Sequence, residues 1–413
     1  MRHHTVYNKS LSAQPRCVKK TDRILAVAAA LAFAPWLFVH SLFRLIKGKK
    51  IVDRVTLHSA AGDGVPALLL HDQVNLSRLP LLLNVIKGEL ALVGYRARTE
   101  QEPAAAGTET LNPGMFSLFE LRRISGIDFI DEEACNLEYA DKQGFKTDAA
   151  IIGKSLLAGL LYSGGKTLKD VDSFTIFGVN IANISMENAL SVINKHVTHR
   201  HRATVFFANA HTLNLAYNDS ELRSQLNQAD YMLPDGSGIE MACRRNGIRR
   251  KGNINGTDML PLLCEQLAQH GQRLFMLGGE DGIADAAMQA MLKQQPHLRS
   301  AGTQHGYFDK QHCQDIVDKI NDSGADVLLV GMGQPLQEQW ILAHREQLNS
   351  PVVIAVGGLF DFYAEKVSRA PLWLRELGME WIWRLLQEPG RMWKRYIIGN
   401  PLFLLRLRQA SQS

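Results

Sequence analysis

The second half of the chain alternates short apolar runs with amphipathic, helix-like stretches. Each run of three to five apolar residues ends in a loop of small or polar residues, and a helical pattern follows the loop. Apolar strands that alternate with helices are typical of a parallel sheet covered by helices on both faces. The pattern therefore predicts a Rossmann-like α/β domain with strands at 204–207, 231–233, 274–277, 327–330 and 352–356.

The loop after 231–233 places a carboxylate at the end of a predicted strand. Gly236 and Gly238 allow the backbone to turn tightly from Asp235 into the helix that begins near Ile239. In open α/β sheets, ligands bind at the carboxyl ends of the strands, where helix N-termini favour phosphate groups. Asp235 is thus suited to general-base catalysis, although aspartate before glycine is also a common turn residue or helix cap.

Glycines follow two more of the predicted strands. Gly278 and Gly279 stand in one loop, and Gly331 and Gly333 stand in another. Such turns let the backbone approach a nucleotide diphosphate closely, although neither loop is a complete dinucleotide-binding fingerprint. We expect these four glycines to belong to a substrate-binding site.

The beginning of the chain contains one long apolar run. Residues 1–22 are polar and basic and are predicted to form a flexible tail, whereas 24–46 is long enough to span a bilayer. Pro35 interrupts this run and basic residues flank both of its ends, which favours a re-entrant helix with both ends on the cytoplasmic face. A buried core helix and a cleaved signal peptide are the alternatives.

Residues 79–94 follow the pattern L-P-x-x-x-N-V-x-K-G-E-x-x-L-V-G. With Arg123-Ile-Ser-Gly126, this pattern resembles the monotopic phosphoglycosyl transferases, which start polysaccharide assembly on a polyprenyl phosphate. The resemblance implies an α-rich, membrane-anchored domain. That family carries an Asp-Glu pair before its Leu-Pro, and here Ser77 and Arg78 stand at those positions. Because arginine cannot act as an acid or base near neutral pH, we interpret the domain as a degenerate relative used for membrane docking or partner binding.

A polar stretch at 166–173 is predicted to link a first domain at 23–165 to a second domain at 174–413. Asp170-Val-Asp172 in this stretch matches the D-x-D pattern of many metal-dependent glycosyltransferases. Two carboxylates in a linker are more often a solvated surface. We therefore expect neither a metal site nor a cofactor.

Ordered motifs in the second domain resemble the WecG/TagA/CpsF glycosyltransferase family. They include Pro234-Asp-Gly236, Asn255-Gly-Thr-Asp258, His305-Gly-Tyr-Phe308, Gly331-Met-Gly-Gln-Pro335 and Arg369-Ala-Pro371. The resemblance implies inverting, metal-independent transfer of a sugar from a UDP-sugar to a polyprenyl-diphosphate-linked saccharide. It also implies a place on the cytoplasmic face of the bacterial inner membrane, in exopolysaccharide, capsule or cell-wall polymer synthesis.

The resemblance assigns roles to single residues. Asp235 stands at the family's catalytic carboxylate and would deprotonate the acceptor hydroxyl. Asn209 and Gln337 would orient donor and acceptor by hydrogen bonds, whereas Tyr307 and Asp361 match positions that hold the uridine and ribose. Each also has a structural alternative, as a helix cap, a core aromatic or a surface helix residue.

Two positions depart from the family's pattern. Phe207 stands where threonine is common, and Asn253 stands where arginine is common. The missing arginine would remove a phosphate clamp, for which the neighbouring Arg249, Arg250 and Lys251 are the candidate substitutes. These departures leave the identity of the donor sugar open.

The stretch 371–408 mixes aromatic and basic residues and holds four of the six tryptophans. Aromatic residues interleaved with cations on short helices are typical of an interfacial element that faces anionic lipid. We expect a helical membrane-binding appendage. Its Arg384, Arg391 and Lys394 are spaced about two helical turns and then one turn apart, and we expect them also to reach the leaving diphosphate, in place of a metal. The alternative is a helical core with a solvated basic rim.

Composition narrows the function classes. The net charge of +5 is mild for 413 residues and, without an aromatic-basic signature or zinc-finger spacing, does not favour nucleic acid as a partner. Five scattered cysteines without a C-x-x-C pair fit a reducing compartment. The expected partners are the UDP-sugar, the lipid-linked acceptor, anionic lipid and other polysaccharide-assembly proteins. A non-catalytic membrane scaffold is the alternative function, and Ser77 and Arg78 disfavour an active phosphoglycosyl transferase.

Overall fold

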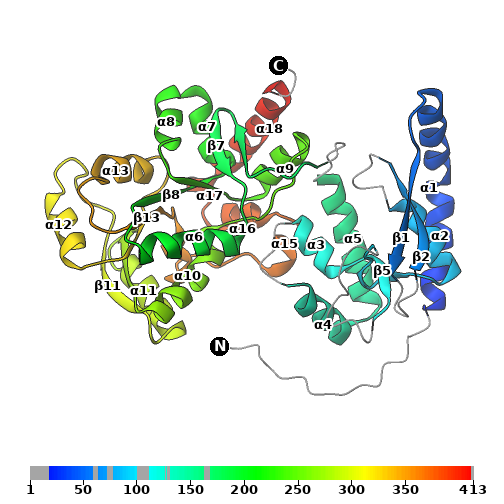
Figure 1. Ribbon diagram of the computed structural model, residues 1–413, viewed down its shortest axis with the longest axis horizontal. Helices are drawn as coiled ribbons and strands as arrows, with labels where there is room; N and C mark the ends of the chain where they lie inside the picture. The colour runs from blue at the N-terminus through cyan, green and yellow to red at the C-terminus, as the bar shows by residue number, and fades with distance from the viewer. Residues whose placement is uncertain are drawn as a thin grey trace.

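The computed structural model describes residues 18–58, 64–71, 78–99, 111–125, 127, 131–161 and 168–410. Most of the predicted tail, Ser77, Gly126 and the start of the predicted linker at 166–167 lie outside the described residues. Figure 1 shows an N-terminal part, coloured blue to cyan, beside a larger C-terminal part coloured green to red.

The C-terminal part is built on one six-stranded sheet in which all neighbouring strands run parallel (Figure 1). In spatial order the strands are β11 (Arg299–Gln304), β10 (Arg273–Gly278), β12 (Val327–Gly331), β13 (Val352–Ala355), β8 (Ala203–Ala208) and β9 (Tyr231–Pro234). The predicted apolar runs correspond to five of these strands, so the parallel sheet is confirmed. The hydrophobic pattern missed β11, which is a partly exposed edge strand without an apolar run.

Helices cover both faces of this sheet and bury it in two apolar clusters. Successive residues of β8 divide between the faces, because Phe206 packs into one cluster and Phe207 into the other. The helices on the Phe206 face are α7 (Ala210–Asn218), α8 (Ser220–Leu226), α9 (Ser237–Arg245), α12 (Gln314–Asp322), α13 (Leu336–His344) and α18 (Gly399–Ala410). The helices on the Phe207 face are α6 (Met186–Thr198), α10 (Gly256–His270), α11 (Ile283–Gln294) and α14 (Leu359–Tyr363). A hairpin of β6 (Ser173–Ile176) and β7 (Val179–Ala182) precedes the sheet.

The N-terminal part is mixed in structure, so the prediction of an α-rich domain was incomplete. Its strands are β1 (Val52–His58) and β2 (Gly64–Leu70), which form an antiparallel pair, and β3 (Ala91–Val93), β4 (Tyr95–Arg96) and β5 (Pro113–Phe116), which form a parallel sheet. Its remaining elements are a 3-10 turn (Leu79–Leu81), α2 (Leu82–Lys87), α3 (Leu118–Ile124), α4 (Glu132–Lys142) and α5 (Phe145–Leu161). Strands of two to four residues are too short to produce a hydrophobic periodicity.

Helix α1 (Lys20–Ile46) contains the predicted membrane segment and continues without a break through Pro35. Ala26 is buried against the N-terminal part. Most of the large apolar side chains of the helix are exposed, and Leu31, for example, is 70% exposed. The helix is long and apolar enough to cross a membrane, which suggests membrane association. The predicted re-entrant path stays a prediction.

The predicted appendage is a series of short helices packed on the sheet domain. They are α15 (Leu372–Arg375), α16 (Glu380–Gln387), α17 (Pro389–Trp393), a π-helical turn (Lys394–Ile398) and α18. Phe403 and Leu407 of α18 are buried in the core of the sheet domain, whereas Trp393, Ile397 and Leu405 are exposed. The appendage therefore has one face in the domain core and one apolar face toward the surroundings.

Candidate active site

A cavity of about 530 Å³ opens at the carboxyl ends of the sheet strands. The four neighbouring strands β12, β13, β8 and β9 end at this edge, and the loops after them supply Gly333, Gly357, Asn209 and Asp235 to the cavity wall. The appendage supplies much of the remaining wall. Both the volume and the place are typical of a ligand site in an open α/β sheet.

Asp235 is held in this wall by its own turn. Its backbone N–H donates to the carbonyl oxygen of Ala208 at 2.8 Å, which ties the turn to β8. Gly236 follows in the left-handed region, with φ at 85°, and its N–H donates to Oδ1 of Asn253 at 2.8 Å. Arg250 closes the turn from outside, because its Nη1 donates to the carbonyl oxygen of Gly236 at 3.0 Å.

The surroundings of Asp235 make it a weaker acid than an ordinary aspartate. Burial raises its pKa to about 6, and the charge of Glu380 acts in the same direction. Arg395, Arg250 and a hydrogen bond from the side chain of Asn209 oppose this rise only in part. A partly buried carboxylate with a pKa close to neutral is suited to accept a proton during a reaction.

Asn209 lies beside Asp235 and is fixed by the helix that follows it. Its Oδ1 caps α7 by accepting hydrogen bonds from the backbone N–H groups of His211 at 3.0 Å and Thr212 at 3.1 Å. Its Nδ2 donates to Oε1 of Gln334 at 3.4 Å. The structure thus brings together Asn209 and Asp235, and Asn209 positions the carboxylate in addition to its predicted contact with substrate.

Gln337 lines the cavity, but its side chain is engaged inside the protein. It is 1% exposed, and its Oε1 accepts hydrogen bonds from the backbone N–H groups of Gly333 at 3.1 Å and Gly357 at 2.9 Å. Its Nε2 donates to Glu338 at 2.8 Å. These contacts favour a bracing role for two of the cavity loops, while the predicted contact with donor and acceptor stays a prediction.

Arg384 gives the cavity a buried positive charge. It is 8% exposed and lines the cavity, with its Nε 2.7 Å from Oε2 of Glu388 and its Nη2 3.5 Å from Oδ2 of Asp361. Its Nη1 is buried and has no hydrogen-bond partner among the residues that the structure describes, and the same holds for Nε of Arg395. Buried guanidinium nitrogens without partners favour binding of an anion. Asp361 pairs with Arg384 here, and its predicted contact with ribose stays a prediction.

The other predicted basic residues differ in position. Arg391 lines the cavity, with Nη1 3.1 Å from Oε1 of Glu388. Lys394 lies outside it, exposed, with its ammonium 5.7 Å from the ring centre of Trp393. Arg395, rather than Lys394, lines the cavity. The break after α16 and the π-helical turn change the helical spacing that the prediction assumed.

Five predicted donor-binding residues are not among those that line this cavity, namely Tyr307, Asp361, Gly278, Gly279 and Gly331. Gly278 ends β10 and Gly279 follows it, whereas Tyr307 follows β11 at the edge of the sheet farthest from β9 and is 74% exposed. The glycine at 278 has a packing role, because a Cβ there would come within 2.2 Å of the carbonyl oxygen of Gly331. Gly333 lines the cavity. The roles of the others in donor binding stay predictions.

None of the three proposed substitutes for the missing arginine lines the cavity. Arg250 is engaged by Gly236 and by Glu240, whose Oε2 lies 2.9 Å from its Nε. Lys251 pairs with the exposed Asp172 at 2.7 Å on the surface. Asp172 is thus part of a surface ion pair, and no group of three His, Cys, Asp or Glu side chains in the described ranges is arranged to hold a metal.

Sequence reasoning missed His211, Glu380 and Arg395, which also line the cavity. Burial and the nearby Arg395 lower the pKa of His211 to about 4, so its imidazole is neutral at physiological pH. Burial raises the pKa of Glu380 against the opposing charges of Arg369 and Arg375. The place of His211, two residues after Asn209 at a strand end, was a usable signal. Glu380 opens the stretch Glu380-Trp-Ile-Trp-Arg384, which matches a motif of the family, whereas Arg395 gave no signal.

Comparison with known proteins places the C-terminal part in a family. The model of the family described as "Glycosyl transferase WecG/TagA/CpsF family" matches residues 174–413. The chain belongs to this family. Two similar proteins are N-acetylglucosaminyldiphosphoundecaprenol N-acetyl-beta-D-mannosaminyltransferases from Staphylococcus aureus strains MW2 and NCTC 8325. Each is 30% identical over 243 residues, which are 57% of this chain and 92% of the relative.

A second family model, described as "Bacterial sugar transferase", matches residues 70–161, which confirms the resemblance in the N-terminal part. Arg78 stands at the position of the glutamate in the family's Asp-Glu pair. It forms an ion pair with the buried Glu120 and donates to the carbonyl oxygen of Met115 at 3.2 Å. Burial alone would raise the pKa of Glu120, but Arg78, Arg123 and Arg96 together hold it below its ordinary value. Arg78 therefore stabilises the first turn of α3, and Ser77 lies outside the described residues.

Proposed function

We propose that this protein is an inverting glycosyltransferase that moves a sugar from a UDP-sugar to a polyprenyl-diphosphate-linked saccharide. Asp235 takes the proton of the acceptor hydroxyl, the hydroxyl oxygen attacks the anomeric carbon, and the bond to the diphosphate of UDP breaks. The names of the relatives make N-acetylmannosamine the first donor sugar to test and N-acetylglucosaminyl-diphosphoundecaprenol the first acceptor.

The observation that carries this proposal is the carboxylate of Asp235 in the cavity wall, with its pKa raised to about 6. Above that pH the carboxylate is ionised and ready to accept a proton, yet its basicity exceeds that of an exposed aspartate. The neutral His211 and the amide of Asn209 line the same cavity. The cavity thus combines a base with groups that can orient a hydroxyl.

The arginines support departure of the diphosphate without a metal. Arg384 and Arg395 each have a buried nitrogen without a partner among the described residues, and Arg391 lines the same cavity. Guanidinium groups bind phosphate oxygens in a bidentate geometry and stabilise the charge that develops on a leaving group. We therefore propose that these arginines hold the diphosphate of UDP.

The exposed apolar surfaces support action at a membrane. Helix α1 exposes most of its large apolar side chains, and Trp393, Ile397 and Leu405 expose another apolar surface on the appendage. Cys135, Cys243, Cys264 and Cys313 are free thiols, as expected in a reducing compartment. We propose that both surfaces engage the cytoplasmic leaflet of the bacterial inner membrane, where a lipid-linked acceptor and a nucleotide sugar meet.

The alternative, a non-catalytic scaffold, predicts a degraded site. The departures at Phe207 and Asn253 are the features that favour it. In the structure Asn253 accepts the N–H of Gly236 and thereby supports the turn that carries Asp235. The arrangement of this turn favours the enzyme.

The test is UDP release by the full-length protein in nanodiscs, with UDP-sugars offered together with polyprenyl-diphosphate-linked acceptors. Acceptor-dependent release should fall by about a hundredfold or more in Asp235→Asn, because a general base contributes roughly that factor. Asp172→Asn is the matched control, since Asp172 is exposed and pairs only on the surface with Lys251. Absence of release with every donor, in protein that still binds the membrane, would reject the enzyme and favour the scaffold.

A further inference from the structure

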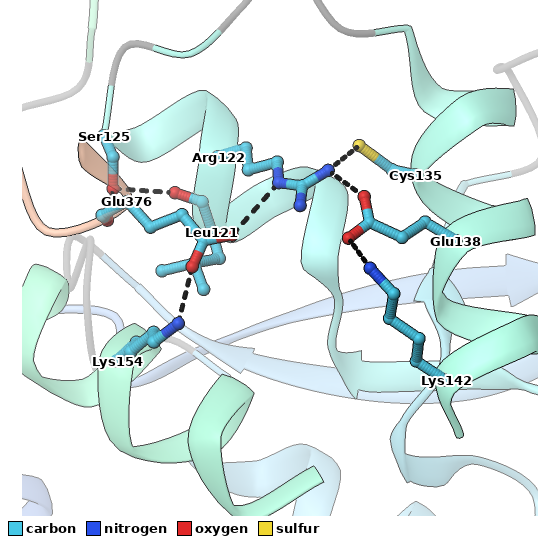
Figure 2. Close-up of polar contacts among 8 residues, drawn as sticks. All are labelled: Leu121, Arg122, Ser125, Cys135, Glu138, Lys142, Lys154 and Glu376. Atoms are coloured by element: carbon cyan, nitrogen blue, oxygen red, sulfur yellow. Dashed lines mark hydrogen bonds and ion pairs between the residues drawn. The ribbon is translucent and has the colours of Figure 1, made fainter. Parts of the chain in front are cut away.

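An ion-pair cluster joins the N-terminal part to the appendage (Figure 2). Glu376, just after α15, is 4% exposed, and both of its carboxylate oxygens face cations from the N-terminal part. Oε1 lies 3.2 Å from Nε of Arg122 on α3, and Oε2 lies 2.6 Å from Nζ of Lys154 on α5. The hydroxyl of Ser125 donates to the carbonyl oxygen of Glu376 as well.

Arg122 is itself held in place within the N-terminal part. It is 2% exposed, and its Nη1 lies 2.7 Å from Oε2 of Glu138 on α4 and 3.7 Å from Sγ of Cys135. Glu138 is shared with Lys142, whose ammonium is 3.0 Å from Oε1 (Figure 2). Buried charges are costly unless they are paired in a defined geometry, so such a cluster fixes one arrangement of the two parts.

The segment that Glu376 anchors is a wall of the cavity. Leu377, Gly378, Met379, Glu380 and Trp381 follow it directly, and all five line the cavity. The N-terminal part lines the same cavity through Ser125 and Ile127.

Two further contacts connect the region of this ion-pair cluster to the C-terminal part. Nη2 of Arg375 lies 3.6 Å from Oδ1 of Asp258 on α10. Arg375 therefore binds the C-terminal part, whereas the adjacent Glu376 binds the N-terminal part. Leu121 and Ala158 of the N-terminal part pack with Met241 of α9, the helix that follows the Asp235 turn. The N-terminal part therefore contacts two of the elements that shape the cavity.

We propose that the N-terminal domain forms one wall of the transferase site, with Arg122, Lys154 and Glu376 as positioning residues for the segment 377–381. This proposal rests on the proposed function and names the lipid-linked acceptor as the substrate that the wall positions. The acceptor is assigned to this side because the wall includes apolar side chains, Ile127, Leu377 and Met379, and because the same domain carries the exposed apolar helix α1. An apolar wall beside a membrane-associated helix suits the polyprenyl chain of the acceptor rather than the nucleotide of the donor.

The experiment compares Lys154→Met and Glu376→Gln with the control Lys142→Met in full-length protein in nanodiscs. Lys142 belongs to the same cluster but contacts Glu138, not the appendage. Two quantities are measured: hydrogen–deuterium exchange of peptides covering 377–381, and KM for acceptor and for donor. Both test variants should raise exchange in this segment and raise the acceptor KM by about tenfold, with the donor KM within about twofold of wild type, whereas the control should change neither.

The double variant Lys154→Met with Glu376→Gln should be no worse than the more impaired single variant, because both remove the same contact. An unchanged acceptor KM, or unchanged exchange at 377–381, would overturn the proposal. The proposal would also be overturned, in favour of a purely structural junction, if the KM values for donor and acceptor worsened together while the folded fraction of the protein fell. Lys154→Met is the milder variant for this comparison, because the side chain of Lys154 is partly exposed. If wild-type protein turned over no donor, the proposed function would fall, and the exchange measurement would still decide whether the N-terminal domain holds the segment.

Discussion

Replacing Asp235 with asparagine should make the protein more stable while removing its activity. The cavity raises the pKa of this side chain from 3.8 to about 6. At about 1.4 kcal/mol for each pKa unit, the ionised carboxylate destabilises the folded state by up to about 3 kcal/mol near pH 8. Asparagine has nearly the same shape and no charge, so Asp235→Asn removes this cost.

The sign of the pH dependence follows from the direction of the shift. Because the folded pKa is raised, the folded state holds a proton between about pH 4 and pH 6 that the unfolded state has released. The wild-type protein therefore loses stability as the pH rises through this window, and the variant does not. The advantage of the variant should be largest near pH 8 and should fall to about 0.5 kcal/mol near pH 4, where Asp235 is protonated in the folded state but only about half protonated in the unfolded state.

Thermal unfolding in detergent at pH 8 and pH 4 is the assay. A gain of about 2–3 kcal/mol corresponds to a rise in Tm of roughly 4–10 °C for a domain of this size. Asp172→Asn is the control, because pairing with Lys251 lowers the pKa of Asp172 and predicts no gain. A Tm at pH 8 that is unchanged or lower, or a gain that is equal at both pH values, would refute the reasoning that burial strains this carboxylate.

Three further outcomes are expected. Arg384→Met should abolish the thermal shift caused by UDP and lower kcat by about a hundredfold, because it removes a buried donor that we propose binds the diphosphate; an undiminished UDP shift would contradict this role. Gln337→Ala should destabilise the protein by about 1–3 kcal/mol in thermal unfolding, since it leaves two backbone N–H groups unpaired, and a change within error would argue against its bracing role. Arg78→Glu should lower the Tm, because it places a second carboxylate beside the buried Glu120. The variant should produce no phosphoglycosyl transfer from a UDP-sugar to polyprenyl phosphate, and a gain of that activity would show that one substitution can restore the N-terminal domain as an enzyme.

The sheet was predictable because its interior strands are continuous apolar runs. Residues at the ends of β8 and β9 were predictable for the same reason, and Asn209 and Asp235 do meet in the cavity. The spatial order of the strands was not predictable from the sequence, because it depends on crossover connections that hydrophobic periodicity does not report. That order separates Tyr307, after the edge strand β11, from Asp235, although both follow strands of one sheet.

The appendage shows a second limit of sequence reasoning. A helical spacing assumed from Arg384 onward selected Lys394, whereas the π-helical turn that begins at Lys394 places Arg395 at the cavity. Gln337 shows a third limit. Its amide was expected to face the substrates, but tertiary contacts with the backbone of two loops engage its oxygen. The contact of Arg122 with Glu376 joins residues that are far apart in the chain and carried no signal in either local sequence.

The close approach of Gly278 and Gly331 also determines where directed evolution of sugar selectivity can begin. A side chain at 278 would collide with the backbone at 331, so mutagenesis of this loop pair would yield misfolded protein before it yielded new specificities. Phe207 and Asn253 line the cavity, and they are the positions at which this chain departs from the pattern of its family. A library that varies Phe207 would change the interior of the site, provided that it keeps the glycines and Asn253, whose side chain supports the turn that carries Asp235.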